Sequence, residues 1–281
     1  MYVLEPPGHF FTSQAKPLWR DWSILITYRF LSLLGCKRVV LGLTLGPFED
    51  AYAKFLGKTS GSYFQIGLRD RESLNLAEKY SFSNTTYIPD LAWYSQEEYA
   101  KMSQSLYVLL SFRDSVTGTR RDMPYFNALT DALDKVLPDL GKKILLFYQT
   151  VYDRNACLDI FDRYQDKHDI EFIDKCLSHT EASILYSGAE LVISNRMHVL
   201  VPALKANTLI FSITDTQRHC KLRSVLYEND IPECFGDLSD QELREKLRLL
   251  QEDRENFLAK VKRIIAGNTA EINSIMNLIW P

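Results

Sequence analysis

Short apolar runs alternate with amphipathic segments along the chain. The runs of strand length fall at 2–4, 38–44, 63–68, 86–88, 106–112, 144–148, 170–173, 191–194 and 208–213. Apolar residues at helical spacing lie between them, most clearly at 22–34 and 124–137. Strands that alternate with helices are typical of parallel sheets, so the pattern predicts an α/β fold.

Two capping boxes mark further helix starts. Ser178 with Glu181 predicts a helix that stops near Gly188, and Ser239 with Glu242 predicts the start of the last long helix.

A polar stretch at 94–105 divides this pattern into two series. We therefore expect two Rossmann-like domains, at 1–104 and 105–281, with a ligand cleft between them. The apolar residues of segment 268–281 predict that the last helix is buried against a partner surface, which leaves two alternatives. The last helix either packs back on the first domain or forms a contact between copies in a homo-oligomer.

Composition narrows the class of protein. Of the 281 residues 46% are hydrophobic, which excludes a disordered chain, and a net charge of −3 argues against general nucleic-acid binding. No apolar run reaches the ~18 residues of a membrane-spanning helix, and the first residues lack a signal-peptide pattern. Five scattered cysteines favour a reduced, cytoplasmic compartment. Cys176 and His179 lack a second close pair, so we expect no metal site.

Candidate chemistry lies where strands end. Arg69, Arg113 and Arg196 each follow a predicted strand, at the sheet edge where such folds bind ligands. Asn195 is the expected cap of a helix that places Arg196 and His198 in its first turn, a ready anion site. Arginine matches phosphate or carboxylate, and histidine transfers protons near neutral pH. The residues predict a small, multiply charged anion, although they leave open that Arg196 only pairs with a structural carboxylate.

Several blocks of sequence resemble one known family. These are GLRDRES at 67–73, YIPD at 87–90, VLLSFR at 108–113 and ELVISNRMH at 190–198. Together they resemble the polysaccharide pyruvyl transferases over about residues 39–235.

The resemblance implies a GT-B-like fold and a defined reaction. Phosphoenolpyruvate would be the donor substrate, with no further cofactor, and pyruvate would be placed as a ketal on a sugar of a cell-surface or exopolysaccharide. Arg196 and His198 would match the donor-binding, catalytic pair, with His198 as general acid. Arg69 would face the same cleft from the first domain, and Arg113 would match by strand position. Asn195 would join Arg69, Arg113, Arg196 and His198 in binding the substrate. Whether the acceptor is lipid-linked, nucleotide-linked or polymeric stays open.

One departure from the family keeps two alternatives in view. Glu5, Pro6, Pro7 and Gly8 stand where a glycine-containing loop would follow the first strand, so the first domain is expected to be shortened at its N-terminus. One alternative is a GT-B glycosyltransferase that uses a nucleotide sugar, with Glu190 or Asp215 on the ribose. The other is a non-catalytic homologue that acts as a binding subunit.

Overall fold

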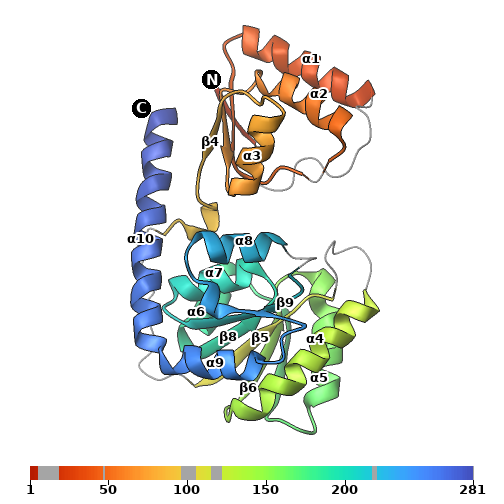
Figure 1. Ribbon diagram of the computed structural model, residues 1–281, viewed down its shortest axis with the longest axis vertical. Helices are drawn as coiled ribbons and strands as arrows, with labels where there is room; N and C mark the ends of the chain where they lie inside the picture. Colours follow the sequence, from red (N-terminus) through yellow and green to blue (C-terminus); the bar gives the residue numbers. More distant parts are fainter. Residues whose placement is uncertain (6–18, 47, 96–105, 115–121, 217–219, 281) are drawn as a thin grey trace. The chain divides into compact units, whose positions relative to one another are not determined.

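The computed structural model describes residues 1–5, 19–46, 48–95, 106–114, 122–216 and 220–280 (Figure 1). It confirms the α/β class, with two sheets whose strands are all parallel. The chain divides into two compact units, Met1–Tyr94 with Gly267–Pro281 and Ser95–Ala266, called unit 1 and unit 2 below. No helix among the described residues is both long enough and apolar enough to cross a membrane.

Unit 1 contains a four-stranded sheet in the order β1-β2-β3-β4. Its strands are β1 (Tyr2–Glu5), β2 (Lys37–Leu43), β3 (Gln65–Leu68) and β4 (Thr85–Tyr87). Its helices are α1 (Trp19–Leu33), α2 (Asp50–Ser60), α3 (Arg71–Lys79) and the 3-10 turn η1 (Leu91–Trp93).

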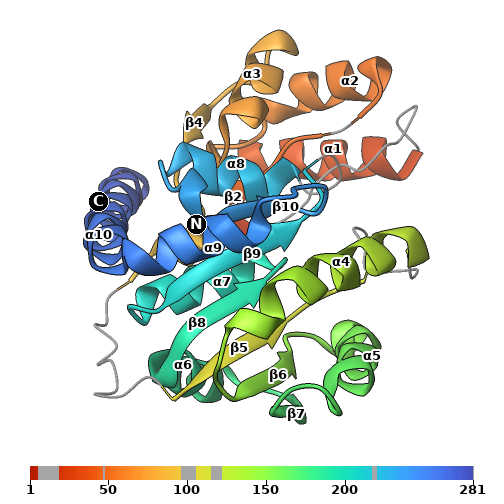
Figure 2. The ribbon, with the colours of Figure 1, turned by 60° about the horizontal axis from the view of Figure 1, so that its bottom comes forward.

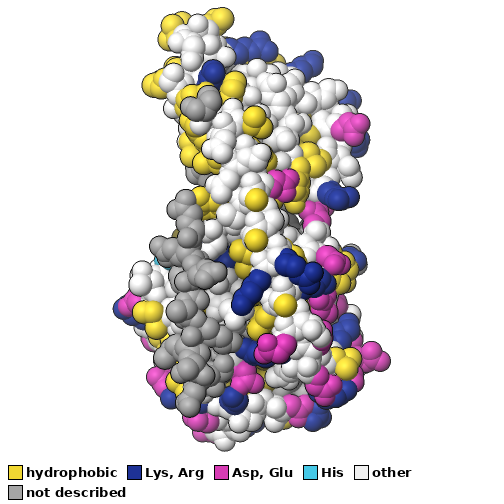
Figure 3. Space-filling model, turned by 90° about the vertical axis from the view of Figure 1, so that its left-hand side faces the viewer, with side chains coloured by type: hydrophobic (Ala, Val, Ile, Leu, Met, Phe, Trp, Pro, Cys, Tyr) yellow, Lys and Arg dark blue, Asp and Glu magenta, His cyan; other side chains and the backbone are white. Residues whose placement is uncertain are grey.

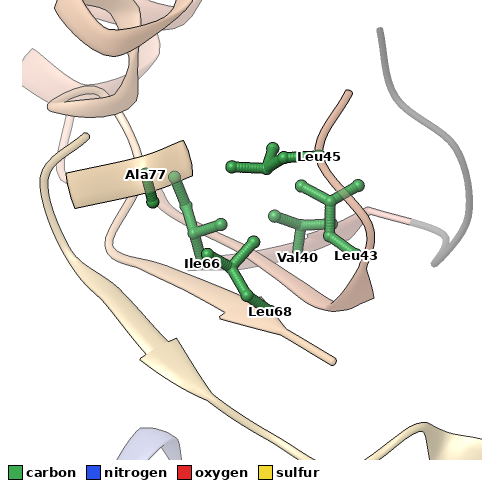
Figure 4. Close-up of a cluster of buried hydrophobic side chains, with 6 residues drawn as sticks. All are labelled: Val40, Leu43, Leu45, Ile66, Leu68 and Ala77. Atoms are coloured by element: carbon green, nitrogen blue, oxygen red, sulfur yellow. The ribbon is translucent and has the colours of Figure 1, made fainter. Parts of the chain in front are cut away.

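A bulge in β2 keeps apolar side chains on one face of this sheet. The register with β3 shifts between Val40 and Leu43, and Gly42 has a φ of 73°, which glycine adopts without strain. The extra residue brings Leu43 to the same face as Val40, where both pack with Ile66 and other buried residues (Figure 4). In a second buried cluster of the same unit, Ile272 and Ile279 of the C-terminal helix pack against Val39, Leu41 and Ile88.

Unit 2 contains a six-stranded sheet in the order β10-β9-β8-β5-β6-β7. The strands are β5 (Tyr107–Ser111), β6 (Ile144–Tyr148), β7 (Ile170–Cys176), β8 (Ala189–Ser194), β9 (Leu209–Thr214) and β10 (Phe235–Asp237). The helices are α4 (Met123–Val136), α5 (Arg154–Tyr164), α6 (His179–Gly188), α7 (Met197–Lys205), α8 (Cys220–Glu228) and α9 (Leu243–Glu252). Helix α10 (Arg254–Ile279) begins in unit 2, and its residues from Gly267 onward belong to unit 1. Short 3-10 turns are η2 (Leu137–Asp139), η3 (Val151–Asp153) and η4 (Pro232–Cys234).

The strand order of unit 2 creates a switch point between β5 and β8. From β5 the chain proceeds outward through β6 and β7, and then returns to the other side of β5 to form β8, β9 and β10. Figure 2 shows α4 and α9 on one face of the sheet and α7 on the other. At such a reversal the loops after the two central strands diverge, which opens a crevice at their carboxyl ends.

Two predictions about helices are wrong, and one is confirmed. The Ser178–Glu181 capping box forms at α6. Ser239 does not open a helix, because its hydroxyl donates to the Asp237 carboxylate in a turn, and α9 begins later at Leu243 without a side-chain cap. The expected single long helix is two helices, α9 and α10, separated at Asp253. The proline sequence after Glu5 and most of the 94–105 stretch lie outside the described residues.

A buried ion pair ties the first two strands of unit 1 together. Arg38 on β2 is 1% exposed and donates from Nε to the Glu5 carboxylate at 2.8 Å. Its guanidinium lies between the rings of Tyr28 and Tyr63, at 3.2 and 3.9 Å from their centroids. Burial raises the pKa of Tyr63, whose hydroxyl donates to Glu5 at 3.1 Å. The cation is therefore matched in charge and stacked on both faces.

Because Glu5 would remain buried without a counter-charge, Arg38→Ala is expected to destabilise unit 1 by about 3–5 kcal/mol. Urea unfolding followed by circular dichroism measures this loss. The matched control is Arg248→Ala on α9, whose salt bridges to Glu245 and Glu252 lie on the surface, and it should cost much less. Equal losses in the two variants would contradict a structural role for the buried pair.

Candidate functional site

At the switch point of unit 2, the side-chain amide of Asn195 connects the segments that follow β5 and β8. Asn195, which follows β8, is 1% exposed. Its Oδ1 accepts from the backbone N–H of Arg113 at 3.0 Å, and its Nδ2 donates to the Arg113 carbonyl at 2.9 Å. Nδ2 also donates to the Tyr125 hydroxyl on α4 at 2.7 Å. The amide thus continues the pairing of β5 with β8 by one more step and fixes the backbone that carries Arg113.

Asn195 is therefore not the helix cap that the sequence suggested. Helix α7 begins at Met197, and Arg196 is its N-cap, without a side-chain cap hydrogen bond. The physical reason is competition, because the Asn195 amide is already used in the contacts with Arg113 and Tyr125. Its role in the structure is to position other groups.

Arg196 is held by a buried carboxylate. Its Nη2 contacts both carboxylate oxygens of Asp153 and donates to the Thr150 hydroxyl at 3.2 Å. The Asp153 side chain is 3% exposed, and Thr150 also donates to it at 3.1 Å. The structural carboxylate that the sequence left open is thus present. Yet Nε of Arg196 is buried without a hydrogen-bond partner among the described residues.

Arg113 differs, because no described residue offers its guanidinium a hydrogen bond or an ion pair. Its Nε is buried and unpartnered, and the side chain is only partly exposed. Burial, and next the positive charge of Arg196, lower the pKa of the Arg113 guanidinium. Desolvated cations of like charge are unfavourable unless an anion joins them. Among the described residues, Asp153 is a carboxylate whose charge acts on both Arg113 and Arg196.

His198 lies in the first turn of α7, two residues after Arg196, and is exposed. Its backbone carbonyl accepts from Nε2 of Gln149 at 3.1 Å, which joins the loop after β6 to this turn. Oε1 of Gln149 is buried and has no hydrogen-bond partner among the described residues. The first-turn N–H groups and the helix dipole add to the positive character of this edge.

Arg69 is placed in unit 1, at the end of β3, and its charge is matched there. Its Nη1 donates to Asp90 at 2.5 Å and its Nε donates to the Thr44 hydroxyl at 2.7 Å. Asp70 caps α3 by accepting from the Ser73 N–H at 2.7 Å. The structure thus brings Arg113, Asn195 and Arg196 together, with His198 in the adjoining turn, whereas Arg69 belongs to the other unit.

The sequence interpretation missed three residues of this site. Gln149, Thr150 and Asp153 follow β6, the strand beside β5. The signal was present, because a buried strand followed by polar residues is the same pattern that identified Arg113 and Arg196. Two thiols lie near them: the exposed Cys176, whose Sγ–H donates to the Gln149 carbonyl at 3.4 Å, and the buried Cys157. Burial raises the pKa of Cys157 to about 12, and its Sγ–H donates to the carbonyls of Phe112 and Phe147.

A pocket of about 530 Å³ adjoins the site on its α4 side. It is lined by Tyr125 with Pro124 and Ala128 of α4, by Asp215 and Thr216 after β9, and by Asp237, Leu238 and Ser239 after β10. Tyr125 links the pocket to Asn195 through its hydroxyl. Among the described residues, no group of three His, Cys, Asp or Glu side chains is placed to hold a metal ion.

Solved structures confirm the fold class, two Rossmann-like domains of the GT-B kind. A glycosyltransferase from Rickettsia africae aligns with a TM-score of 0.60 at 12% identity, over 92% of this chain and 72% of that one. The UDP-GlcNAc 2-epimerase of Methanocaldococcus jannaschii aligns with a TM-score of 0.60 at 11% identity, over 92% and 73%. TarM aligns at 0.58 and 11% identity over 88% of this chain, which spans only 51% of TarM.

Comparison of the sequence identifies a family as well as a fold. No protein of curated function matches the chain. The profile of one family, described as polysaccharide pyruvyl transferase, matches residues 10–213, a range that includes Arg69, Arg113 and the segment from Glu190 to His198. Because the match extends over most of the chain, the protein belongs to the polysaccharide pyruvyl transferase family.

Proposed function

We propose that the protein transfers pyruvate from phosphoenolpyruvate to two hydroxyl groups of a sugar or glycan, forming a ketal and releasing phosphate. Family membership supports a transferase acting in polysaccharide biosynthesis. The observation that supports the choice of donor is Arg113, a partly buried side chain whose guanidinium receives no hydrogen bond or ion pair from the described residues, beside Arg196.

The donor's charge fits this site. Phosphoenolpyruvate carries a phosphate and a carboxylate on adjacent atoms, and each group accepts the paired hydrogen bonds of a guanidinium fork. No described residue occupies the guanidinium of Arg113, whereas Asp153 holds Nη2 of Arg196 and leaves its Nε without a partner in the described part of the chain. A donor bound between them would supply the negative charge that this edge lacks.

The reaction needs proton transfer as well as charge. His198, as imidazolium, protonates the methylene carbon of the donor while a sugar hydroxyl attacks the neighbouring carbon. The bond from that carbon to the phosphate oxygen then breaks, and the second hydroxyl closes the ketal. Of the two hydroxyl protons, one restores His198 and the other leaves with phosphate. Arg113 and Arg196 stabilise the negative charge that develops on the departing phosphate.

A second candidate, transfer from a nucleotide sugar, is favoured by the pocket beside Tyr125. Asp215 lines this pocket together with an aromatic ring, a combination suited to a nucleoside. Glu190 does not serve that role from its position. It lies at the amino end of β8 and forms a salt bridge with Lys142, away from the edge where ligands bind.

Replacing Arg113 tests the donor site. Arg113→Met removes the unpaired cation, so it should raise the melting temperature of the ligand-free protein. It should also weaken phosphoenolpyruvate binding by about 10- to 100-fold, because charge-assisted hydrogen bonds are lost. Calorimetric titration and thermal shift with phosphoenolpyruvate measure both effects.

The matched control is Arg154→Met, which removes a surface arginine paired with Asp174 and should leave binding unchanged. Stabilisation of the wild-type protein by UDP, and none by phosphoenolpyruvate, would contradict the proposed donor and favour the nucleotide sugar.

Replacing His198 tests the proton step. His198→Asn should lower kcat for phosphate release by about 10²- to 10⁴-fold, the usual contribution of a general acid. Phosphoenolpyruvate affinity should change far less, because the arginines remain. The assay follows inorganic phosphate over a panel of sugar acceptors, with binding of the donor titrated in parallel. A variant that loses donor binding and keeps kcat would show that His198 binds the donor and transfers no proton.

A further inference from the structure

Helix α1 presents an apolar face to solvent along its whole length. Trp19, Trp22, Ile26, Phe30 and Leu33 are all exposed, and their spacing of three or four residues places them on one side of the helix. Leu34, directly after the helix, is also exposed. Figure 3 shows hydrophobic side chains gathered at its upper end, the height at which Figure 1 draws α1. We call these six residues the α1 stripe.

The opposite face of α1 already attaches the helix to unit 1. Leu25 is buried and packs with Tyr52, Phe55 and Leu56 of α2. The ring of Tyr28 stacks on the buried guanidinium of Arg38. Within the stripe, only Trp22 makes a ring contact with this core, at 4.7 Å between its centroid and that of Phe55.

Basic residues outnumber acidic ones in the sequence that contains the stripe. Asp21 is the only acidic residue between Glu5 and Glu49, and the same span contains five Lys or Arg residues in a chain whose net charge is −3. Arg38 is one of these five and is neutralised by Glu5. The remaining four are Lys16 and Arg20 before or early in the helix, Arg29 within it and Lys37 just after it.

We propose that α1 docks the protein on the surface of a bilayer that contains anionic phospholipid. Tryptophan and phenylalanine in an apolar helix face, with basic residues around them, are suited to the boundary between lipid headgroups and acyl chains. The helix would lie along the surface, with the stripe in the apolar layer and Arg29 and Lys37 among the phosphates. The excess of basic residues favours this occupant over a second copy of the chain, whose own stripe would bring like charges together.

Docking of this kind would also narrow the acceptor. A sugar carried on a lipid is confined to the bilayer surface, and an enzyme held there meets it at high local concentration. We therefore infer a lipid-linked acceptor, a step that rests on the proposed function, whereas docking itself does not.

Tryptophan fluorescence makes the test direct. The protein has four tryptophans, of which Trp93 is buried, Trp280 is partly buried, and the exposed pair, Trp19 and Trp22, lies in the stripe. The full chain is mixed with phosphatidylcholine vesicles that contain phosphatidylglycerol, or with phosphatidylcholine alone, and binding is also measured by co-sedimentation. We expect a blue shift and co-sedimentation with the anionic vesicles, both weakened by salt because the charges are exposed.

A matched pair of variants tests whether vesicle binding depends on the α1 stripe or on any exposed apolar side chain. Ile26 on α1 and Ile184 on α6 are similarly exposed, at 67% and 60%. Ile26→Glu should weaken vesicle binding about ten-fold or more, whereas Ile184→Glu should leave it unchanged. Arg29→Glu should weaken binding about five-fold or more, since one cation is lost and one anion gained. Circular dichroism confirms that each variant is folded.

Three results would overturn the proposal. The first is that the wild-type protein does not bind anionic vesicles. The second is that Ile26→Glu and Ile184→Glu weaken vesicle binding equally. The third is that the wild-type protein is a dimer that does not bind vesicles and that Ile26→Glu converts to a monomer. The last would assign the stripe to a second copy. Binding of phosphoenolpyruvate without vesicles is titrated on the same samples, so failure of docking and failure of the proposed donor site are distinguished.

Discussion

A desolvated guanidinium needs a negative partner, and at the switch point of unit 2 the described residues provide one partner for two guanidiniums. Asp153 neutralises Arg196, while Arg113 remains without a counter-charge. Asn195 makes this arrangement persistent, because its amide fixes both backbone groups of Arg113. Under the proposed function, binding of phosphoenolpyruvate at Arg113 would stabilise this edge of the sheet.

Unit 1 shows what the same residue type does when it is structural. Arg38 is sealed between two tyrosine rings and paired with Glu5, and Arg69 donates to Asp90 and Thr44. Both cations have their charge matched within the unit. Arg113 differs from them because no carboxylate among the described residues forms an ion pair with it.

The sequence predicted the α/β class, most strands and the strand-end arginines, because these depend on local periodicity and on the parallel arrangement. It did not predict which strands are neighbours. Asp153 precedes Arg196 by 43 residues and reaches it only because β6, β5 and β8 are adjacent. The same pairing explains why Asn195, a good cap by its type, is used elsewhere. Helices α2 and α5 were also missed.

The central claim is that the charge missing beside Arg113 is supplied by the donor, and a crystal structure of the protein with phosphoenolpyruvate examines it most directly. The account predicts phosphate or carboxylate oxygens of the donor within hydrogen-bond distance of the Arg113 guanidinium, with Asn195 still bonded to its backbone and Asp153 still holding Arg196. A donor bound elsewhere, with Arg113 paired to a carboxylate of the protein itself, would contradict it.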